Sequence, residues 1–594
     1  MTILPFLAVA FGAAAASLLT RGNAALSATI GIVGLAGTVI AAAAIRTNES
    51  LTIGGSQLVG SDYLRLFTVL GSMSALVLAV LGLATTSHRH APGVLLAGIG
   101  AAGLALALPD ARLAVMAATA GGLTGILVTV VSPSTAASVI VAVRELRAVA
   151  LAGFLSILAA AWLARPLGEL AAEPEVFGLA YLGFAAAVAI RFGAIPFHFW
   201  AARLADAAPE VTLPMLMAWG PAAFAVVALA WTDQSVAPLL LPLTIERGLV
   251  VVIGVASILL GSLAAWIQDD LEHVVGYTIV ADAGVAILGL AALDPAAWEP
   301  ARSWILVFAM VRSAFAGWVV ALHGAYGTRR IDSLRGWALR SPLLGLALVV
   351  IAVAGIGWPG LLAWNARASL IGFSLAGPIG WLVFVGAVAP VAIYARLLVF
   401  GVGRPTEIVA SGHSERPTWP APMPSRPMRG RGGTERAFER TSHAINGSVD
   451  VLWTVPAGVR ANRSLIAGVL VLGLAGLSFA VSAGGLGVPA AAAALPAGNP
   501  EPIGSEPPSE SEAPSGSEAP SGSEAPSGPE APSESEAPSE SGSQGGSEPP
   551  IGTAPPVAPS GSLIPSAPPA SPGRSSRGSP PSGASPSFQP LPTF

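Results

Sequence analysis

The chain contains no cysteine and no lysine, so all 30 of its basic residues are arginine. The absence of cysteine excludes disulfides, c-type haem attachment and iron–sulfur clusters held by thiolates. The absence of lysine removes the one amine that could change its charge near neutral pH when buried, because arginine keeps its proton there. Charged residues make up only 11% of the chain, and no basic stripe with interleaved aromatic side chains indicates nucleic acid.

Apolar residues dominate what remains: they make up 53% of the 594 residues, and the mean hydropathy is +0.68. Apolar runs of roughly 18 to 25 residues, enough to cross about 30 Å of hydrocarbon, recur along the chain. We therefore expect an all-α polytopic membrane protein with about 14 transmembrane helices. The expected spans are 2–20, 25–45, 63–85, 91–108, 111–131, 136–164, 176–200, 209–232, 246–266, 273–293, 302–325, 341–363, 366–401 and 464–486. The first has no basic leader, so we expect a spanning helix and not a removable signal.

The spans divide the chain into four parts. Residues 1–401 form the expected membrane core, and 464–486 form the last transmembrane helix. Between them, 402–463 is rich in Pro, Arg and Gly and is expected to be a flexible loop, with a short amphipathic helix over 434–452 as the alternative. Residues 495–594 are mostly Pro, Ser, Glu and Gly, a composition that predicts a disordered tail.

Arginines in the connections predict the orientation in the cell inner (cytoplasmic) membrane. Four of them follow the eleventh expected span, from Arg329 to Arg340, and nine follow the thirteenth, from Arg404 to Arg463. Both connections follow odd-numbered spans, so both can be cytoplasmic at once. The long 402–463 loop is then cytoplasmic, and both termini lie outside.

The middle of the chain carries an interrupted span with charged residues beside the interruption. Pro196 should break or kink the helix near Ile195, because proline removes a backbone donor and clashes with the preceding turn. Arg191 lies about one turn before this point, and His198 lies just after it. A fixed charge and a group that titrates near neutral pH, beside a broken membrane helix, are typical of an ion or proton path.

Three motifs resemble the proton-translocating antiporter-like family, which includes large membrane subunits of respiratory complex I and subunits of multi-subunit sodium/proton antiporters. The first is Ala194-Ile195-Pro196-Phe197-His198-Phe199-Trp200, similar to Ala-Val-Pro-Phe-His-x-Trp in the family's broken seventh helix. The second runs from Gln268 to Thr278 and is similar to Gln-Thr-Asp-Leu-Lys-Arg-Leu-Leu-Ala-Tyr-Ser. The third is Val353-Ala354-Gly355-Ile356-Gly357-Trp358-Pro359-Gly360, similar to the break in the family's twelfth helix. The resemblance covers roughly residues 50 to 400.

This resemblance implies two five-helix repeats of inverted topology, over spans 4–8 and 9–13, with broken helices near 195 and 357. It also implies proton movement along a line of charged residues and water, switched by buried lysines paired with acids. Here Arg191 replaces the lysine of the seventh helix, and Ala222 falls at the lysine position of the eighth. The glutamate of the fifth helix falls on or beside Thr119, and the lysine of the twelfth falls near Asn365.

Five charged or titratable residues are therefore the candidates for a proton path. They are Arg191, His198, Asp282, Arg312 and Arg367, and the helix breaks are Pro196, Gly357 and Pro359. Asp282 either binds a proton or ion, or forms a structural ion pair with Arg312. His198 either relays protons or caps the broken helix.

Other polar and aromatic residues receive structural interpretations. Glu145, between Arg144 and Arg147, is expected in an ion cluster at the membrane surface, and His323 is interpreted as an interfacial or capping residue. Seven tryptophans fall mostly near span ends, which is typical of an aromatic belt. They are Trp200, Trp219, Trp231, Trp266, Trp304, Trp318 and Trp381.

Together the resemblance and the residues predict an antiporter-like membrane subunit of an NADH-quinone oxidoreductase-type complex, taking part in proton translocation coupled to quinone reduction. The missing lysines and glutamate leave two alternatives open: a diverged scaffold subunit that moves no protons, and a component of a multi-subunit sodium/proton antiporter. No cofactor is expected in this chain, since quinone, flavin and iron–sulfur clusters would belong to partner subunits. The expected partners are other membrane subunits and the lipid bilayer.

Overall fold

The computed structural model describes residues 2–85, 91–131, 136–162, 174–232, 243–375, 377–403 and 463–484, all within the compact unit Met1–Pro507. Nearly all of the predicted 402–463 loop and the whole 495–594 tail lie outside these residues. Among the described residues, nine helical segments are long and apolar enough to cross a membrane. Four shorter helices are also apolar. The expectation of a mostly helical, multi-pass membrane protein is thus confirmed.

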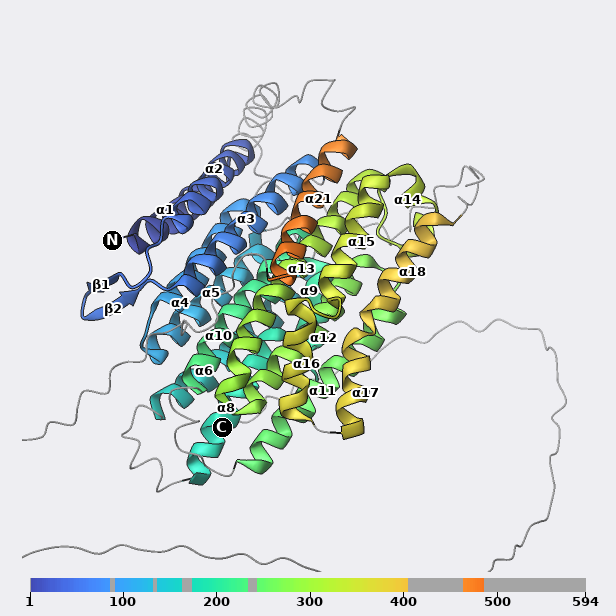
Figure 1. The fold of residues 1–594 in the computed structure, drawn as a ribbon. Coiled ribbons are helices and arrows are strands. Elements are labelled where there is room, and N and C mark those ends of the chain that lie inside the picture. Colours follow the sequence, from blue (N-terminus) through green and yellow to red (C-terminus); the bar gives the residue numbers. More distant parts are fainter. Residues whose placement is uncertain are drawn as a thin grey trace, which may run out of the picture. The chain divides into compact units, whose positions relative to one another are not determined.

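The helices follow one another along the sequence (Figure 1). Those of the first half are α1 (Ile3–Leu19), α2 (Ala24–Ala43), α3 (Asp62–Thr85), α4 (Ala91–Ala107), α5 (Ala111–Val131), α6 (Ala136–Trp162), α8 (Pro174–Phe192), α9 (Phe199–Ala207) and α10 (Gly220–Trp231). Those of the second half are α11 (Thr244–Ile267), α12 (Leu271–Ala292), α13 (Trp298–Tyr326), α14 (Trp337–Arg340), α15 (Pro342–Ile356), α16 (Leu362–Ser374), α17 (Gly377–Val388), α18 (Pro390–Val402) and α21 (Arg463–Ser482). Four single turns join them: η1 (Glu210–Thr212), η2 (Met215–Trp219), η5 (Pro295–Ala297) and η6 (Ile331–Leu334).

A short β-hairpin departs from the all-α expectation. Strands β1 (Ser50–Ile53) and β2 (Ser56–Val59) pair antiparallel, with Ile53 opposite Ser56. The two-residue loop Gly54-Gly55 has φ angles of 58° and 84°, which glycine adopts without a steric penalty. Such a loop matches the twist of the two strands, so the Gly-Gly pair explains the hairpin between α2 and α3.

Helix α13 is the centre of the described bundle. It contacts α3, α10, α12, α15, α16 and α21, so helices from distant parts of the sequence surround it. Figure 1 shows α21 beside α13 and α15, although α21 begins only at Arg463, far along the chain from both. Every residue of its most apolar 18-residue stretch is buried. A charge within this stretch of α13 therefore faces protein and not lipid.

The first broken helix is the α8–α9 pair. Helix α8 ends at Phe192, and Gly193 follows with a φ of 61°, just before the predicted break at Ile195 and Pro196. The carbonyl of Ile190, near the end of α8, accepts hydrogen bonds from the amide of Gly193 at 3.0 Å and from Trp200 Nε1 at 2.9 Å. The amide of Ile195 donates to Ser257 Oγ of α11 at 3.0 Å. Side chains thus satisfy backbone groups that a membrane cannot.

The second broken helix is the α15–α16 pair. Gly357, with a φ of 68°, ends α15, and α16 begins only at Leu362, so Pro359 lies in the connection. This corrects the expected span 366–401: residues 362–374 complete the broken helix, and the next apolar span is Gly377–Val402. Gly377, with a φ of 69°, marks that boundary. A glycine turn does not stand out in a hydropathy profile, and this explains the difference.

Helices α11 and α12 approach each other closely through glycine. A Cβ atom built on Gly284 would lie 2.5 Å from the carbonyl oxygen of Gly254. A Cβ on Gly261 would lie 2.9 Å from the amide nitrogen of Ala281. Small residues at a helix interface permit such backbone contact, which is a common way of joining helices in membranes.

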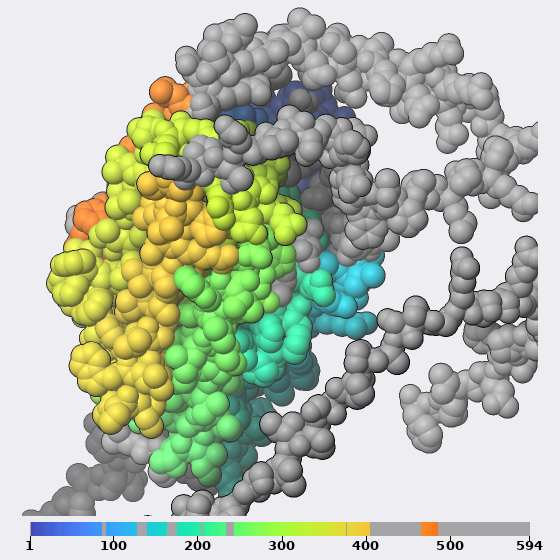
Figure 2. Space-filling model, turned by 90° about the vertical axis from the view of Figure 1, so that its right-hand side faces the viewer, coloured from blue at the N-terminus to red at the C-terminus, as the bar shows by residue number. Residues whose placement is uncertain are grey.

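The outward faces of the helices remain apolar. Figure 2 shows α17 and α18 (yellow) beside α11 (green), and these helices are also in contact. Large apolar side chains on them are exposed, among them Trp381 and Val399. An exposed apolar face on several neighbouring helices fits contact with lipid or with another membrane subunit.

Candidate functional site

Asp282 and Arg312 form a buried ion pair between α12 and α13. Arg312 Nη2 lies 2.6 Å from Asp282 Oδ2, and Nε donates to the same oxygen at 2.7 Å. Arg312 Nη1 donates to the hydroxyl of Tyr394 on α18 at 2.9 Å. The two charged residues are 4% and 1% exposed, so water hardly screens the pair. The ion pair expected from sequence as one of two alternatives is therefore present.

Arg367 lies next to this pair and caps the second broken helix. Its guanidinium donates to the carbonyls of Gly355 and Ile356, the last residues of α15 before the break. A cation at a helix C-terminus also interacts favourably with the helix dipole. The guanidinium lies 4.6 Å from the centre of the Trp304 ring, and Trp304 Nε1 donates to the backbone carbonyl of Asp282. Arg367, Trp304 and Asp282 thus form one connected centre with Arg312.

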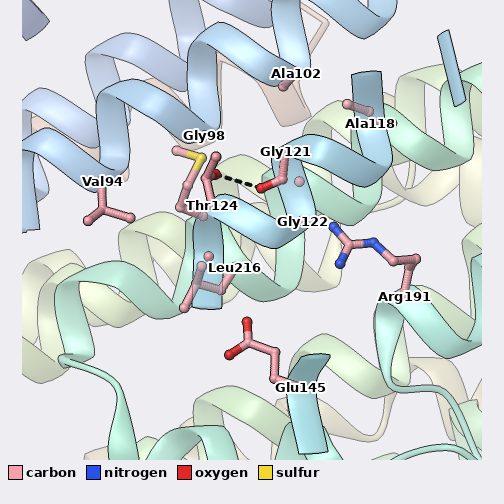
Figure 3. Close-up of a pocket in the computed structure, with 14 residues that line it drawn as sticks. Val94, Gly98, Ala102, Ala118, Gly121, Gly122, Thr124, Glu145, Arg191 and Leu216 are labelled. Atoms are coloured by element: carbon pink, nitrogen blue, oxygen red, sulfur yellow. Dashed lines mark hydrogen bonds between the residues drawn. The ribbon is translucent and has the colours of Figure 1, made fainter. Parts of the chain in front are cut away.

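A second centre surrounds Arg191 on α8, one turn before the first break. Arg191 is 4% exposed, and it lines a cavity of about 20 Å³ together with Glu145 of α6, which is 3% exposed. That volume accommodates a water molecule. Figure 3 shows the two side chains on opposite sides of the cavity. Within the described part of the chain, Glu145 Oε2 and Arg191 Nε have no hydrogen-bond partner.

Helix α5 supplies the space for this centre. A Cβ atom built on Gly122 would lie 2.4 Å from Arg191 Nη1, and one on Gly125 would lie 3.2 Å from Glu145 Oε1. The small residues of α5 therefore leave room for the guanidinium and the carboxyl. The acid that faces Arg191 is carried by α6, whereas the resemblance led us to look for it at Thr119 of α5.

The position of Glu145 corrects the sequence interpretation. Arg144 and Arg147 are exposed, but Glu145 is buried and points to the opposite side of α6. No ion cluster joins the three, because neighbouring positions on a helix face different directions. The sequence could not predict which of these three side chains is buried, because the other residues of α6 are apolar on every side of the helix.

One aromatic residue, Trp219, and one polar residue, Ser313, connect the two centres. A Cβ on Gly220 would lie 3.7 Å from Arg191 Nη2, so the start of α10 borders the first centre. The preceding residue, Trp219, is fully buried and donates from Nε1 to Ser313 Oγ at 2.9 Å. Ser313 follows Arg312 directly in α13. The two centres are thus joined through residues 219–220 and 312–313.

His198 stands apart from the other four candidates. Its ring stacks on Phe199 with the centroids 4.5 Å apart, and it makes no side-chain cap of α9. In the residues that the structure describes, its Nδ1 has no hydrogen-bond partner, and no ion pair links it to Arg191, Asp282, Arg312 or Arg367. The sequence expectation of a helix-capping side chain is therefore not met.

A third charged group was missed by the sequence interpretation. Arg329, after α13, contacts the buried carboxylates of Glu210 in η1 and Glu272 in the first turn of α12. His323, at the end of α13, places Nδ1 2.7 Å from Glu210 Oε1, so it is not merely an interfacial residue. One signal was available: Glu272 and His273 stand where the second motif of the family has Lys-Arg.

Asp270 precedes Glu272 and begins α12. Its side chain accepts a hydrogen bond from the amide of Glu272 at 2.9 Å, which caps the helix. Burial opposes ionisation of this carboxyl, but the hydrogen bond with His273 and the guanidinium of Arg329 outweigh burial and lower the pKa of Asp270. Asp270 is therefore charged at neutral pH.

The charged groups do not resemble a metal site. In the described ranges, no group of three or more His, Asp or Glu residues is arranged to hold a metal ion. Every charged centre instead contains an arginine, which repels cations. The arrangement suits the binding and transfer of protons between carboxyl groups and water.

Comparison with known proteins gives a consistent result. Residues 149–392 match the family model described as NADH:quinone oxidoreductase/Mrp antiporter, transmembrane. NADH-quinone oxidoreductase subunit N of Chlorobium chlorochromatii is 28% identical over 248 residues, which are 40% of this chain and 48% of the relative. Subunit N 2 of Solidesulfovibrio magneticus is 30% identical over 215 residues, covering 36% and 45%. The chain thus spans about half the length of the curated relatives it matches.

Solved structures extend the similarity of the fold over most of the chain. A chain of the Mrp complex from a Dietzia species has a TM-score of 0.63 at 17% identity, covering 83% of this chain and 95% of that one. A chain of respiratory complex I from Thermus thermophilus has a TM-score of 0.55 at 19% identity, covering 81% and 100%. The resemblance inferred from the three motifs is confirmed: residues 149–392 match this family model, and the fold is similar to that of subunits of the Mrp complex and complex I.

Proposed function

We propose that this chain is an antiporter-like membrane subunit of an NADH-quinone oxidoreductase-type complex and takes part in proton translocation coupled to quinone reduction. The observation that carries this proposal is the placement of a buried carboxyl and a buried arginine beside each broken helix. Glu145 faces Arg191 near the first break, and Asp282 pairs with Arg312 near the second. Buried charges in membrane helices are expensive and mark ion paths.

In this proposal the carboxyl groups carry the protons and the arginines are fixed charges. Arginine does not release its proton, so the switching that lysine provides in the family passes to Glu145 and Asp282. A proton on either acid neutralises it and weakens its attraction to the facing arginine. Water in the cavity at Arg191 and the link through Trp219 and Ser313 would join the two halves. His198, which lies in the first break, would exchange protons with this route.

We further propose that the chain crosses the membrane 14 times, with inverted repeats α4–α10 and α11–α18. In each repeat the fourth span is broken after a glycine of positive φ, Gly193 or Gly357. The positive-inside rule places Arg329–Arg340 and the 402–463 loop in the cytoplasm and both termini outside. Residues 1–401 then form the translocating core, 464–486 the last span, and 495–594 a disordered tail.

The redox chemistry belongs to partner subunits in this proposal. The chain has no cysteine for an iron–sulfur cluster, so we assign clusters, flavin and quinone to other subunits of the complex. Its own residues would then respond to quinone reduction elsewhere in the complex.

Proton uptake by inverted membrane vesicles that contain the native complex tests the proposal. Asp282→Asn, Glu145→Gln and Arg191→Ala should each lower the protons moved per electron, at assembly levels matched to wild type. Glu299→Gln is the control, because Glu299 is an exposed acid at the start of α13. Wild-type stoichiometry in all three variants would instead identify a scaffold subunit. Uptake that needs sodium and no quinone reduction would identify an antiporter component.

A further inference from the structure

The group around Arg329 joins segments that are far apart in the sequence. Arg329 Nη1 contacts both Glu210 Oε1, at 3.2 Å, and Glu272 Oε2. Two carboxylates that share one guanidinium nitrogen lie close enough to repel each other. The backbone carbonyl of Arg329 accepts from the amide of Leu271 at 3.1 Å, which fixes the arginine against the start of α12.

Burial within this group is graded. The side chains of Glu210 and Glu272 are 4% and 3% exposed, whereas those of His323 and Arg329 are 32% and 36% exposed. The histidine and the arginine thus border the solution, and the two glutamates lie beneath them. In the described residues, Glu210 Oε2 has no hydrogen-bond partner, although its side chain is almost fully buried. An unpaired buried carboxylate oxygen is costly, and a proton on this carboxyl would remove the buried negative charge.

The charges of the group do not balance without protons. Glu210, Glu272 and Asp270 are three acids, and among the described residues Arg329 is the permanent cation in contact with them. His323 and His273 contact Glu210 and Asp270 and become cations only by taking up a proton. Each proton bound therefore reduces an excess of buried negative charge, which low-polarity surroundings favour.

Few other charged residues lie on the described parts of the neighbouring elements. Helix α4 and the adjacent end of α3, residues 81–85, carry no charged residue. Arg203 of α9, Arg330 and Asp332 are exposed, and Arg396 of α18 pairs with Asp269.

We propose that Glu210 and Glu272 share a proton and form, with His323 and Arg329, a proton-binding site at this end of the membrane spans. His323 passes the proton between the solution and Glu210 Oε1, and Arg329 stabilises the remaining negative charge. The proton is bound and released without any covalent change. The role of this site rests on the proposed function: it collects protons from the cytoplasmic side for the buried acids.

The position of the site fits that role. Glu272 and Asp282 lie ten residues apart on α12, and His323 and Arg312 lie eleven apart on α13. At about 1.5 Å per residue, both separations are about 15 Å along the helix. Two adjacent helices therefore carry matched acid–base groups at the membrane end and at mid-membrane.

Infrared difference spectroscopy of the full-length chain, purified with the subunits it retains and held in lipid nanodiscs, tests the site. Titration of wild type near neutral pH should show a carboxyl band that disappears as the shared proton is lost. Glu210→Gln and Glu272→Gln should each remove this band, and the exposed-acid control Glu299→Gln should retain it. Persistence of the band in both variants would overturn the proposal.

A second variant keeps the test decisive if a glutamine variant does not fold. Arg329→Gln removes the cation that favours the ionised form, so the midpoint of the band should move to higher pH. An unchanged or lower midpoint would overturn the site. The readout is separate from transport: a confirmed band together with normal pumping by Asp282→Asn would retain the site and reject the proposed function. Loss of pumping in Asp282→Asn with an unaffected band in both glutamine variants would retain the proposed function and reject the site.

Discussion

The two broken helices solve the same backbone problem with different chemistry. At α8–α9 the carbonyl of Ile190 accepts from the neutral indole of Trp200 and from the amide of Gly193, while the nearby charge of Arg191 faces a small cavity. At α15–α16 the freed carbonyls of Gly355 and Ile356 accept from the guanidinium of Arg367 itself. The first break leaves its charge available to water, whereas the second uses its charge to hold the backbone together. The charge thus faces a water-sized cavity at one break and holds the backbone at the other.

The largest expected effect is the loss of stability when an acid that pairs directly with arginine is removed, compared with an acid that only faces one across a cavity. Asp282→Ala leaves Arg312 buried without its partner, which should cost about 3–5 kcal/mol. Glu145→Ala should cost clearly less, because no direct ion pair joins Glu145 to Arg191 within the described residues. Thermal unfolding of the purified chain in detergent measures both. The double variant Asp282→Ala/Arg312→Met should recover most of the loss, and an equal loss in the two single variants would remove the distinction.

A comparison of the two caps gives an effect of similar size. Arg367→Met removes hydrogen bonds from a charged donor to two carbonyls, each worth about 1.5–3 kcal/mol. Trp200→Phe removes one neutral hydrogen bond, worth about 0.5–1.5 kcal/mol. Hydrogen exchange in the segments around 355–361 and 190–197 should show greater local opening in the first variant. Greater opening after Trp200→Phe would mean that the roles of the two caps are reversed.

Gly122→Ala tests the first centre without removing a charge. The new methyl group would lie 2.4 Å from Arg191 Nη1, so the guanidinium has to move away from its present position. Since the end of a flexible side chain can yield, we expect a stability loss below about 1 kcal/mol together with reduced proton uptake. Gly183→Ala on α8 is the matched control, since nothing lies within 4 Å of its Cβ position. Normal proton uptake in Gly122→Ala would show that the position of Arg191 does not matter.

The smallest expected effect concerns the pH dependence at Asp270. Its pKa is lower in the folded chain, so its charge stabilises the fold at pH values above its ordinary pKa of about 3.9. That contribution disappears as the pH falls through the folded-state pKa. Asp270→Asn keeps a good helix cap but should lower the unfolding temperature at pH 7 and converge with wild type in acid. A constant difference at every pH would assign the loss to the cap.

Local backbone chemistry made much of the fold predictable from sequence. Pro196 and the Gly357–Pro359 stretch interrupt helices wherever they occur, so both breaks could be located. Asp282 and Arg312 are single charges on consecutive apolar spans, which left few possible partners. Their pairing was therefore foreseeable, although its role was not.

The orientation of side chains around each span was not predictable. In an amphipathic helix the polar face fixes the rotation, but these spans are apolar on every side. Glu145 was for this reason assigned to the surface, and tryptophans were assigned to the interfacial belt. Trp219, Trp304 and Trp318 are instead almost fully buried, and each donates its indole N–H inside the bundle. The Glu210–Glu272–Arg329 contacts join three distant segments, and only the tertiary structure brings these together.

The close glycine contacts between α11 and α12 have a mechanical consequence for Asp282. Ala281 and Gly284, on either side of this acid, press against the backbone of α11 at Gly261 and Gly254. A rotation of α12 that carried Asp282 away from Arg312 would drive backbone into backbone. The two helices therefore hold Asp282 in place. The ion pair has to open through movement of the long arginine side chain on α13 and of the tyrosine on α18, with water entering between them.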